Sequence, residues 1–422
     1  MILIQGGIVM TKEGPIEADV AIEAGVVSSI APQIEGLASH IIDASGCLVG
    51  PGFVDLHAHF RDPGQTWKED LETGSRTAAH GGYTAVVVMP NTEPAIDTSD
   101  AVVDISERAK EVGLVTLGLS GALTRGRQGV EATDIEALYE AGVRIFSDDG
   151  DSVEDLNLLR LQMLRTSLLP GAVVSQHAED VTQTDGGHLH DGEMAERHGL
   201  GGLSSAAESD VVRRDLELTE ETGCHYHCQH VSAAETVDLI RRAKERRLQV
   251  TAEVTPHHLY FTEGDLEVLD TNLKMYPPVR SESDRQALIG ALREGTIDAV
   301  ATDHAPHSAI EKNVPFSEAP RGVIGLETAA SATWMVLEDP KRFFEVMSVT
   351  PAAIAGMDDQ GQWPSVGGSA NVVVFDPVES WVPEDFASRS ANSPFIGRDL
   401  TGRVLATVHK GQLTYELVRA ND

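Results

Sequence analysis

Cysteines, basic residues and long hydrophobic runs are all scarce in this sequence. Only 3 of the 422 residues are cysteines, and a small, odd number does not suggest the disulfide framework of a secreted protein. No apolar run approaches the roughly 20 residues that cross a bilayer, and residues 1–10 lack the basic leader of a signal peptide. We therefore expect a cytoplasmic protein that neither spans a membrane nor is exported.

The shortage of basic residues gives the chain a strong negative charge. Lys and Arg number 32 against 66 Asp and Glu, which leaves a formal net charge of −34. Phosphates of nucleic acids and anionic membranes would repel such a surface, so we expect neither as a partner. We interpret the excess first as a source of solubility and second as an adaptation to a salty environment.

Short strands near both ends predict a small second domain. With 422 residues, 41% of them hydrophobic, the chain is long enough for one large domain and a smaller one. Short apolar runs separated by turns, typical of an antiparallel sheet, occur at 1–4, 18–22, 26–30, 41–43, 371–375, 403–408 and 413–415. Neither end can bury a core alone, so we expect residues 1–50 and 361–422 to form one composite β-sandwich domain.

The residues between these ends alternate strand-like and helical patterns. After a strand that ends at His57, apolar runs occur at 84–90, 114–120, 143–149, 172–179, 225–232, 250–256 and 297–303. Amphipathic helical stretches separate them, for example at 98–112, 205–222, 233–247 and 283–294. Eight such units predict an α/β fold, a TIM-like (β/α)8 barrel over residues 51–360.

Metal-ligating residue types gather at the predicted carboxyl ends of these strands, where barrel active sites form. His57 and His59 lie two apart on a strand and so project to the same side. An isolated pair of this kind is more often two ordinary core or surface histidines. Matching residues recur at later strand ends, however: Asn91, Asp148, Asp149, His177, His230 and Asp303. Together they predict a centre of two divalent ions that share a bridging carboxylate.

Such a centre suits hydrolysis, and nearby polar residues suggest its substrate. Two cations lower the pKa of a shared water, and we expect Asp303 to carry the proton to the leaving nitrogen. Arg61 can pair with a substrate carboxylate, while Asn91 and His307 can bind other polar groups. The polar stretch 308–318 predicts a lid over the mouth. His257 and His258 are candidates for supporting contacts behind the metal ligands.

The motifs as a whole resemble the amidohydrolase superfamily and, within it, the class I bacterial dihydroorotases. The resemblance covers nearly the whole chain and rests on the segments at 52–64, 89–92, 146–150, 229–232, 251–258 and 301–307. The His-x-His start is shared by the superfamily, whereas the context of Arg61, Met-Pro-Asn at 89–91 and Asp-Asp-Gly at 148–150 are narrower.

The resemblance implies a two-zinc enzyme that interconverts dihydroorotate and N-carbamoyl-aspartate in pyrimidine biosynthesis. It implies metal binding by His57, His59, Asp149, His177, His230 and Asp303, with Asp303 also the acid/base. Asp149 would bridge the metals, although Asp148 beside it stays an alternative. Substrate contacts would come from His59, Arg61, Asn91, Tyr276, His307, Arg321 and Gly322.

Two positions depart from the family pattern, and rival functions stay open. The family usually has asparagine at 276 and an aromatic or apolar residue at 321, and both changes concern substrate recognition. One rival is an allantoinase or hydantoinase, which usually bridges its metals with a carboxylated lysine; residues 143–150 contain no lysine. Another is a non-catalytic assembly partner of aspartate carbamoyltransferase. The oligomeric state, including a homodimer, and association with that transferase are left open.

Overall fold

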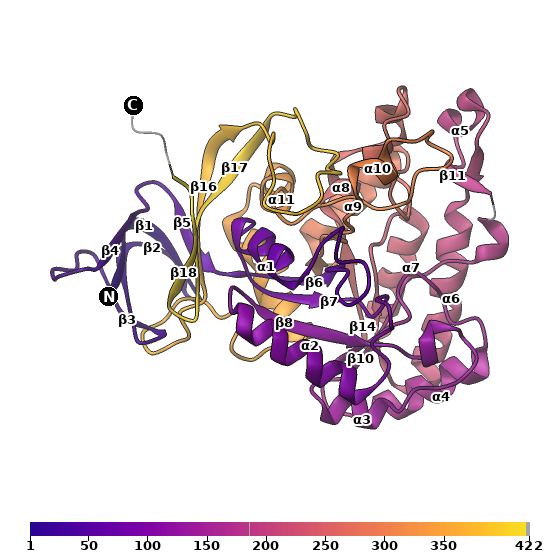
Figure 1. Ribbon diagram of the computed structural model, residues 1–422, viewed down its shortest axis with the longest axis horizontal. Coiled ribbons are helices and arrows are strands. Elements are labelled where there is room, and N and C mark those ends of the chain that lie inside the picture. The colour runs from indigo at the N-terminus through magenta and orange to yellow at the C-terminus, as the bar shows by residue number, and fades with distance from the viewer. Residues whose placement is uncertain (185, 419–422) are drawn as a thin grey trace.

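The computed structural model describes residues 1–184 and 186–418 and consists of a barrel with a sheet at one side (Figure 1). Within these residues, eight parallel strands pair in sequence order. They are β6 (Phe53–Ala58), β7 (Tyr83–Val88), β8 (Thr116–Gly121), β9 (Ile145–Phe146), β10 (Val173–Gln176), β13 (His225–Cys228), β14 (Val250–Val254) and β15 (Ala299–Val300).

The barrel closes between its first and last strands. Residue 304, just beyond β15, forms a parallel bridge with Ala58, and the backbone N–H of His59 donates to the carbonyl of His304 at 2.9 Å. The predicted (β/α)8 fold is therefore confirmed, and each predicted barrel run contains a strand. The strands are buried on both faces, which explains why they appear in the sequence as apolar runs.

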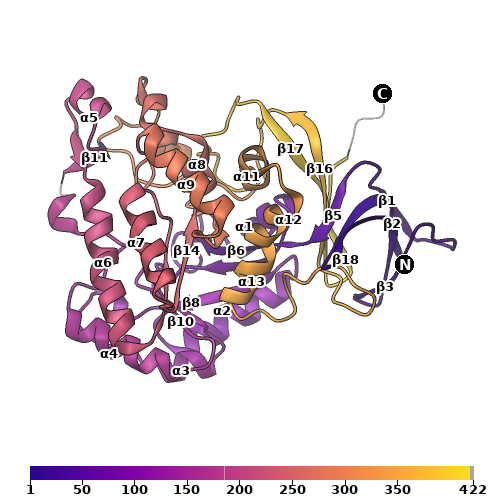
Figure 2. The same cartoon turned by 180° about the vertical axis from the view of Figure 1, so that it is seen from behind.

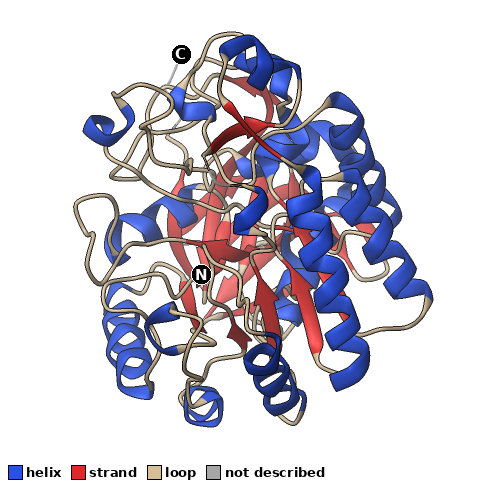
Figure 3. Ribbon diagram, turned by 90° about the vertical axis from the view of Figure 1, so that its right-hand side faces the viewer, coloured by secondary structure: helices blue, strands red, loops and turns tan. Residues whose placement is uncertain are grey.

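Helices surround the strands, as the view along the barrel shows (Figure 3). The longer ones are α1 (Leu71–His80), α2 (Ser99–Val112), α4 (Leu156–Ser167), α6 (Ser205–Thr222), α7 (Ala234–Glu245), α9 (Glu282–Glu294) and α11 (Ala329–Leu337). Shorter helices are α3 (Ile135–Glu140), α5 (Glu193–His198), α8 (Pro256–Tyr260), α10 (Ala309–Lys312), α12 (Pro340–Phe344), η5 (Glu345–Val349) and α13 (Thr350–Ile354). Single 3-10 turns lie at η1 (Arg125–Arg127), η2 (Val181–Gln183), η3 (Glu263–Leu266) and η4 (Thr271–Leu273).

Helix boundaries follow capping residues in the sequence. Ser204 caps α6 by accepting from the N–H of Ala206, and Gly223 ends it in the left-handed conformation, with φ 68°. Ser281 and Asp284 form a capping box at the start of α9. The four helices predicted from periodicity are confirmed as α2, α6, α7 and α9.

Strands from both ends of the chain form a second sheet. Its members are β1 (Ile2–Thr11), β2 (Gly14–Glu23), β3 (Val26–Ala31), β4 (His40–Asp43), β5 (Leu48–Pro51), β16 (Val372–Trp381), β17 (Leu400–His409) and β18 (Gln412–Glu416). β5 joins the two ends because it pairs with β1 on one side and β16 on the other. Apolar residues of both ends share one buried cluster, including Ile4, Val20, Val49, Val374 and Leu405. The predicted two-ended β domain is thus present.

The sheet is attached to the barrel by helices and by chain continuity. A single residue, Gly52, separates the end of β5 from the start of β6. Seen from behind, α11, α12 and α13 lie between the barrel and the sheet (Figure 2), and α11 contacts β17 while α12 contacts β5. Among the residues that the structure describes, no helix is long and apolar enough to cross a membrane.

A glycine-rich segment after β10 contains two further strands. β11 (Gly187–His190) and β12 (Gly201–Leu203) pair in parallel and enclose α5. Glycine at 187, 201 and 202 hides the strand pattern in the sequence, because glycine has low strand propensity.

The junction between α1 and β7 gives a stability prediction. A Cβ on Gly81 would lie 2.2 Å from the carbonyl oxygen of Leu326, a backbone atom that cannot rotate away. Gly81→Ala should therefore lower the free energy of unfolding by roughly 1–3 kcal/mol through overpacking. The matched control is Gly290→Ala on the exposed face of α9, where a Cβ meets open space; it should raise stability by about 0.5–1 kcal/mol. Denaturant melts of both variants measure the difference, and equal stabilities would contradict the packing argument.

Candidate metal centre and substrate cavity

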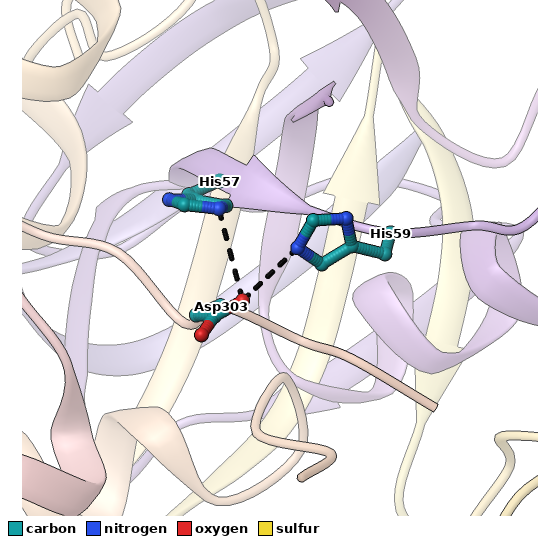
Figure 4. Close-up of side chains that lie close together, drawn as sticks. All are labelled: His57, His59 and Asp303. Atoms are coloured by element: carbon teal, nitrogen blue, oxygen red, sulfur yellow. Dashed lines mark hydrogen bonds and ion pairs between the residues drawn. The ribbon is translucent and has the colours of Figure 1, made fainter. Parts of the chain in front are cut away.

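Two histidines from β6 and one aspartate beyond β15 meet at the carboxyl end of the barrel. His59 Nε2 lies 3.0 Å from Asp303 Oδ1, and His57 Nε2 lies 3.7 Å from the same oxygen. Figure 4 shows both imidazoles directed at this carboxylate. The first and last strands are neighbours only because the barrel closes, so closure places these residues together. One ligand atom from each lies within 4.8 Å of the others, as a metal site requires.

A second group shares His57 with the first. His57, Asp149 and His230 also bring one potential ligand atom each within 4.8 Å of one another. Asp149 Oδ1 is 3.1 Å from His57 Nε2, and Asp149 Oδ2 is 3.6 Å from His59 Nε2. Asp148, the alternative from the sequence, instead accepts from the backbone N–H and hydroxyl of Thr124. Asp149 is therefore the one that faces the histidines.

His177, the remaining predicted ligand, lies against His230. Its Nδ1 is 2.8 Å from His230 Nε2, and its Nε2 is 3.3 Å from Glu179 Oε2. The contact with Glu179 favours a proton on His177 Nε2. His177 Nδ1 can then accept a hydrogen bond from His230 Nε2–H, and with the His230 proton on Nδ1 instead, each of the two nitrogens could bind a cation. This pair, together with the two groups around His57, fits a centre that binds more than one divalent ion.

Burial and mutual charge set the protonation of these groups. Burial alone would raise the pKa of Asp149, but His57, His59 and His177 hold that pKa well below its usual value. Burial likewise opposes ionisation of Asp303, yet its hydrogen bond with His59 and the charge of His57 keep its pKa low. Burial and the neighbouring imidazoles of His177 and His57 lower the pKa of His230 to about 3. Ionised carboxylates and a neutral imidazole are the forms that bind metal ions.

His57 shows where positive charge is needed. Burial alone would lower its pKa, but Asp149, Glu253 and Asp303 raise the pKa well above its usual value. The cluster thus draws a proton to His57 when nothing else neutralises the carboxylates. A metal cation at the same nitrogen would supply the charge instead.

Three residues of this region have backbones in the left-handed region. Arg61, His230 and Asp303 have φ values of 59°, 29° and 45°. Such a conformation costs about 1–3 kcal/mol for residues other than glycine and concentrates at functional sites. Here it turns each chain at the end of its strand, so that the side chain points into the shared space.

A cavity of about 500 Å³ opens over the metal-ligand cluster. The predicted residues that line it are His59, Arg61, Asn91, Asp149, His177, His230, Tyr276, Asp303, His307, Arg321 and Gly322. The structure therefore brings every predicted substrate residue to one cavity. His57, and Asp148 as the alternative to Asp149, do not line it; the His57 side chain lies deeper, 1% exposed.

Several cavity side chains carry polar atoms that the protein itself does not satisfy. Among the described residues, Arg61 Nε, Tyr276 Oη and His307 Nδ1 are buried and have no hydrogen-bond partner. Unpaired buried polar atoms are costly. Their presence around one cavity offers hydrogen-bonding groups to a polar ligand.

The two residues that depart from the family pattern contact each other. The Arg321 guanidinium lies 3.7 Å from the centroid of the Tyr276 ring, a favourable cation–π geometry. Tyr276 in turn stacks on His177, with centroids 5.4 Å apart. The two departures therefore form one wall of the cavity.

Asn91 is tied to the metal-ligand cluster as well as to the cavity. Its Oδ1 lies 2.8 Å from His59 Nδ1, and its Nδ2 donates to Asp149 Oδ2 at 3.2 Å. The sequence suggested a direct bond to substrate. In the structure, its amide orients two predicted ligands.

The sequence analysis overlooked Glu253 and Glu179 as parts of this region. Glu253 lies on β14 and contacts His57 at 2.9 Å, while Glu179 contacts His177. The sequence feature that could have revealed Glu253 is a carboxylate within an otherwise largely apolar strand. His258, proposed for such a role, instead bonds Thr255 and the carbonyl of Pro277.

The predicted lid segment is anchored in this structure. It contains α10, and the buried ammonium of Lys312 donates to the carbonyls of Thr271, Lys274 and Pro320 at 2.8, 3.3 and 3.0 Å. Lid motion stays a prediction.

Comparison with known proteins points to one family. A family model described as Dihydro-orotase-like matches residues 46–236. The dihydroorotase of Geobacillus sp. (strain WCH70) is 40% identical over 98% of this chain and 99% of its own length. That of Bacillus subtilis (strain 168) is 39% identical over 98% of each chain, and that of Mycobacterium bovis is 42% identical over 94% of each.

Solved structures confirm the fold. The L-hydantoinase (dihydropyrimidinase) of Arthrobacter aurescens superposes with a TM-score of 0.85 at 27% identity, covering 98% of this chain and 96% of that one. A D-hydantoinase from Bacillus sp. AR9 gives a TM-score of 0.84 at 25% identity, with coverage of 99% and 95%. Sequence identity is clearly higher to the dihydroorotases, and it extends over nearly the full length of the chain. This protein therefore belongs to the dihydroorotase family of the amidohydrolase superfamily.

Proposed function

We propose that this chain is a dihydroorotase that interconverts dihydroorotate and N-carbamoyl-aspartate in pyrimidine biosynthesis. The observation that carries the proposal is the cavity in which a histidine–carboxylate cluster meets Arg61 and other unsatisfied polar groups. Similarity of about 40% to dihydroorotases over nearly the whole chain supports it.

We further propose that the centre holds two zinc ions. His57, His59 and Asp303 form one candidate group, His57, Asp149 and His230 another, and the pairing of His177 with His230 supports a second ion. Nitrogen and oxygen donors without thiolate suit hydrolytic zinc. When bound, the ions would polarise the scissile carbonyl and lower the pKa of a water between them.

Asp303 is proposed to move the proton. Its carboxylate is ionised, because neighbouring histidines hold its pKa low, and it borders the cavity. It can therefore accept a proton from the attacking water and deliver it to the ureido nitrogen as the ring C–N bond breaks. In the reverse direction the same group takes the proton from that nitrogen.

Arg61 is proposed to bind the substrate carboxylate. Burial lowers the pKa of this guanidinium, and the charges of Asp303 and Asp149 oppose that shift; the cation persists because an arginine stays charged at neutral pH. Its unpartnered Nε supports a bond to an anionic ligand. His307, Tyr276, Arg321 and Gly322 are proposed to complete the enclosure, and Asn91 and His59 to border the reacting amide.

The alternative is a hydantoinase- or allantoinase-type amidohydrolase, which the hydantoinase-like fold supports. Two features favour the dihydroorotase. An aspartate, Asp149, occupies the position between the histidine groups, with no lysine in 143–150. The cavity also contains Arg61, which an uncharged cyclic amide does not need. A role restricted to assembly is disfavoured because the candidate ligands lie together.

Other parts of the proposal rest on the sequence and the resemblance. We propose a cytoplasmic location, supported by three buried cysteines, and domain boundaries at residues 50 and 361, supported by the joining of both ends in one sheet. A homodimer and an association with aspartate carbamoyltransferase stay predictions from the resemblance.

The direct test compares substrates and metal dependence. Zinc-loaded protein should hydrolyse dihydroorotate at least tenfold more efficiently, in kcat/KM, than hydantoin or allantoin. Dialysis against a chelator should abolish turnover, and zinc should restore it. A preference for hydantoin or allantoin would instead identify the protein as a hydantoinase- or allantoinase-type amidohydrolase.

Asp303→Asn tests the proton carrier. Asparagine tolerates the left-handed backbone of this position, so the fold should persist. Without a proton acceptor, kcat should fall roughly 10²–10⁴-fold while KM changes little. Steady-state kinetics on metal-loaded variant and wild type decide this, and a kcat within a few fold of wild type would refute the role.

Arg61→Met tests the carboxylate contact. The variant should lose roughly 10- to 100-fold in kcat/KM for dihydroorotate, the equivalent of about 1.5–3 kcal/mol for a charge-assisted hydrogen bond. Slow hydrolysis of an uncharged cyclic amide should be unaffected. Arg247→Met is the matched control, since Arg247 is exposed and also has a positive φ, 63°. Equal losses on both substrates would exclude carboxylate recognition by Arg61.

A further inference from the structure

A single carboxylate, that of Glu253, contacts two predicted metal ligands, His57 and His230, on the side away from the cavity. Glu253, on β14 and 1% exposed, places Oε1 2.9 Å from His57 Nδ1. The same oxygen accepts from the backbone N–H of His230 at 3.3 Å. Its other oxygen, Oε2, lies 3.0 Å from His227 Nε2. Both oxygens are thus committed to the barrel interior, and Glu253 does not line the cavity.

The contact with His57 determines which imidazole nitrogen carries a proton. An ionised carboxylate can only accept, so Nδ1 of His57 must donate to it. The lone pair of the neutral ring is then at Nε2, which faces Asp149 and Asp303 at 3.1 and 3.7 Å. Because His57 belongs to both candidate groups, this one hydrogen bond orients a ligand that the two groups share.

The contact with His230 has a different role. His230 has a φ of 29°, a conformation that is unfavourable without support. A hydrogen bond from its N–H to Glu253 stabilises the turn that directs the imidazole toward His57 and His177. Glu253 thereby connects the backbone of one predicted ligand to the side chain of another.

A chain of hydrogen bonds holds Glu253 in turn. His227 Nε2–H donates to Glu253, so its Nδ1 must accept, and Thr251 Oγ1 lies 2.8 Å from that nitrogen. Thr251 Oγ1 then accepts from His225 Nε2 at 2.9 Å. Every donor meets an acceptor along this chain. The chain of hydrogen bonds links β13 to β14 and leads away from the cavity. It restrains the orientation of the Glu253 carboxylate.

We propose that Glu253 is a positioning residue for the metal centre, which fixes the tautomer of His57 and the backbone of His230. The proposal rests on the proposed metal binding but not on the identity of the substrate. A carboxylate behind a metal-binding histidine also makes the ring a stronger ligand. Loss of that carboxylate should therefore weaken metal binding although it removes no ligand.

The test is the metal affinity of Glu253→Gln. A glutamine has nearly the same shape, but in either orientation of its amide His57 loses the charged acceptor. Zn²⁺ affinity, measured by competition with a chromophoric chelator, should fall roughly 10- to 100-fold. The visible spectrum of the Co²⁺-loaded variant should also differ from that of the wild type, since coordination at His57 changes.

The matched control is Glu208→Gln. Glu208 is also buried, 4% exposed, and it accepts from the backbone N–H groups of Ser232 and Ala233 at 3.2 and 3.1 Å. This variant should keep the wild-type Zn²⁺ affinity and Co²⁺ spectrum. If Glu253→Gln does not fold, Glu253→Asp, which retains the charge but withdraws it from His57, should show the same direction of change.

The outcomes separate this inference from the proposed function. Wild-type Zn²⁺ affinity and an unchanged Co²⁺ spectrum in the Glu253 variant, or an equal loss in the Glu208 control, would overturn the positioning role. Weakened metal binding in the Glu253 variant alone would support it, even if the wild type hydrolysed no dihydroorotate. Because affinity is measured without substrate, failure of the assigned activity would leave this result intact.

Discussion

Compensation of buried charge is the constraint on which this structure depends. Three carboxylates are almost completely buried here, those of Asp149, Asp303 and Glu253. Each lies within about 3 Å of an imidazole of His57 or His59. Isolated buried carboxylates are too costly to keep. They persist because imidazoles surround them; burial alone would lower the pKa of His57, but Asp149, Glu253 and Asp303 raise it. A metal cation bound at His57 would supply positive charge beside these carboxylates.

The barrel architecture brings residues from short, distant segments of the sequence into this one cluster. Each strand contributes one or two residues at its carboxyl end, and closure between β6 and β15 brings His57 and His59 beside Asp303. The left-handed turns at Arg61, His230 and Asp303 redirect the chain immediately afterwards. The predicted metal ligands lie at the carboxyl ends of the strands. The loops that follow the strands place Arg61, Tyr276, His307 and Arg321 around the cavity. The terminal sheet lies at the other side and contributes no residue to this cavity among those described.

Two neighbouring departures from the family pattern border the cavity, and we propose that they contribute to substrate recognition. Tyr276 and Arg321 stack on each other and, through Tyr276, on His177. Considered singly, each puts the substrate in doubt. Their contact shows instead that the two positions form one wall, with the tyrosine hydroxyl still available to a ligand.

The sequence by itself determined the elements and the candidate ligands. Apolar runs and amphipathic stretches predicted the barrel strands and the longer helices, because a buried parallel strand and a packed helix each impose a strict pattern. The strand-end position of His57, His177, His230 and Asp303 predicted a shared site, since parallel strands end at the same edge. Only the tertiary structure decided what depends on contacts between distant segments. It placed Asp149 rather than Asp148 against the histidines, engaged Asn91 with ligands, and put Glu253 behind His57. Asp148 and Asp149 are the same residue type in the sequence, and only the closed barrel fixes which way each side chain faces and which partner it meets.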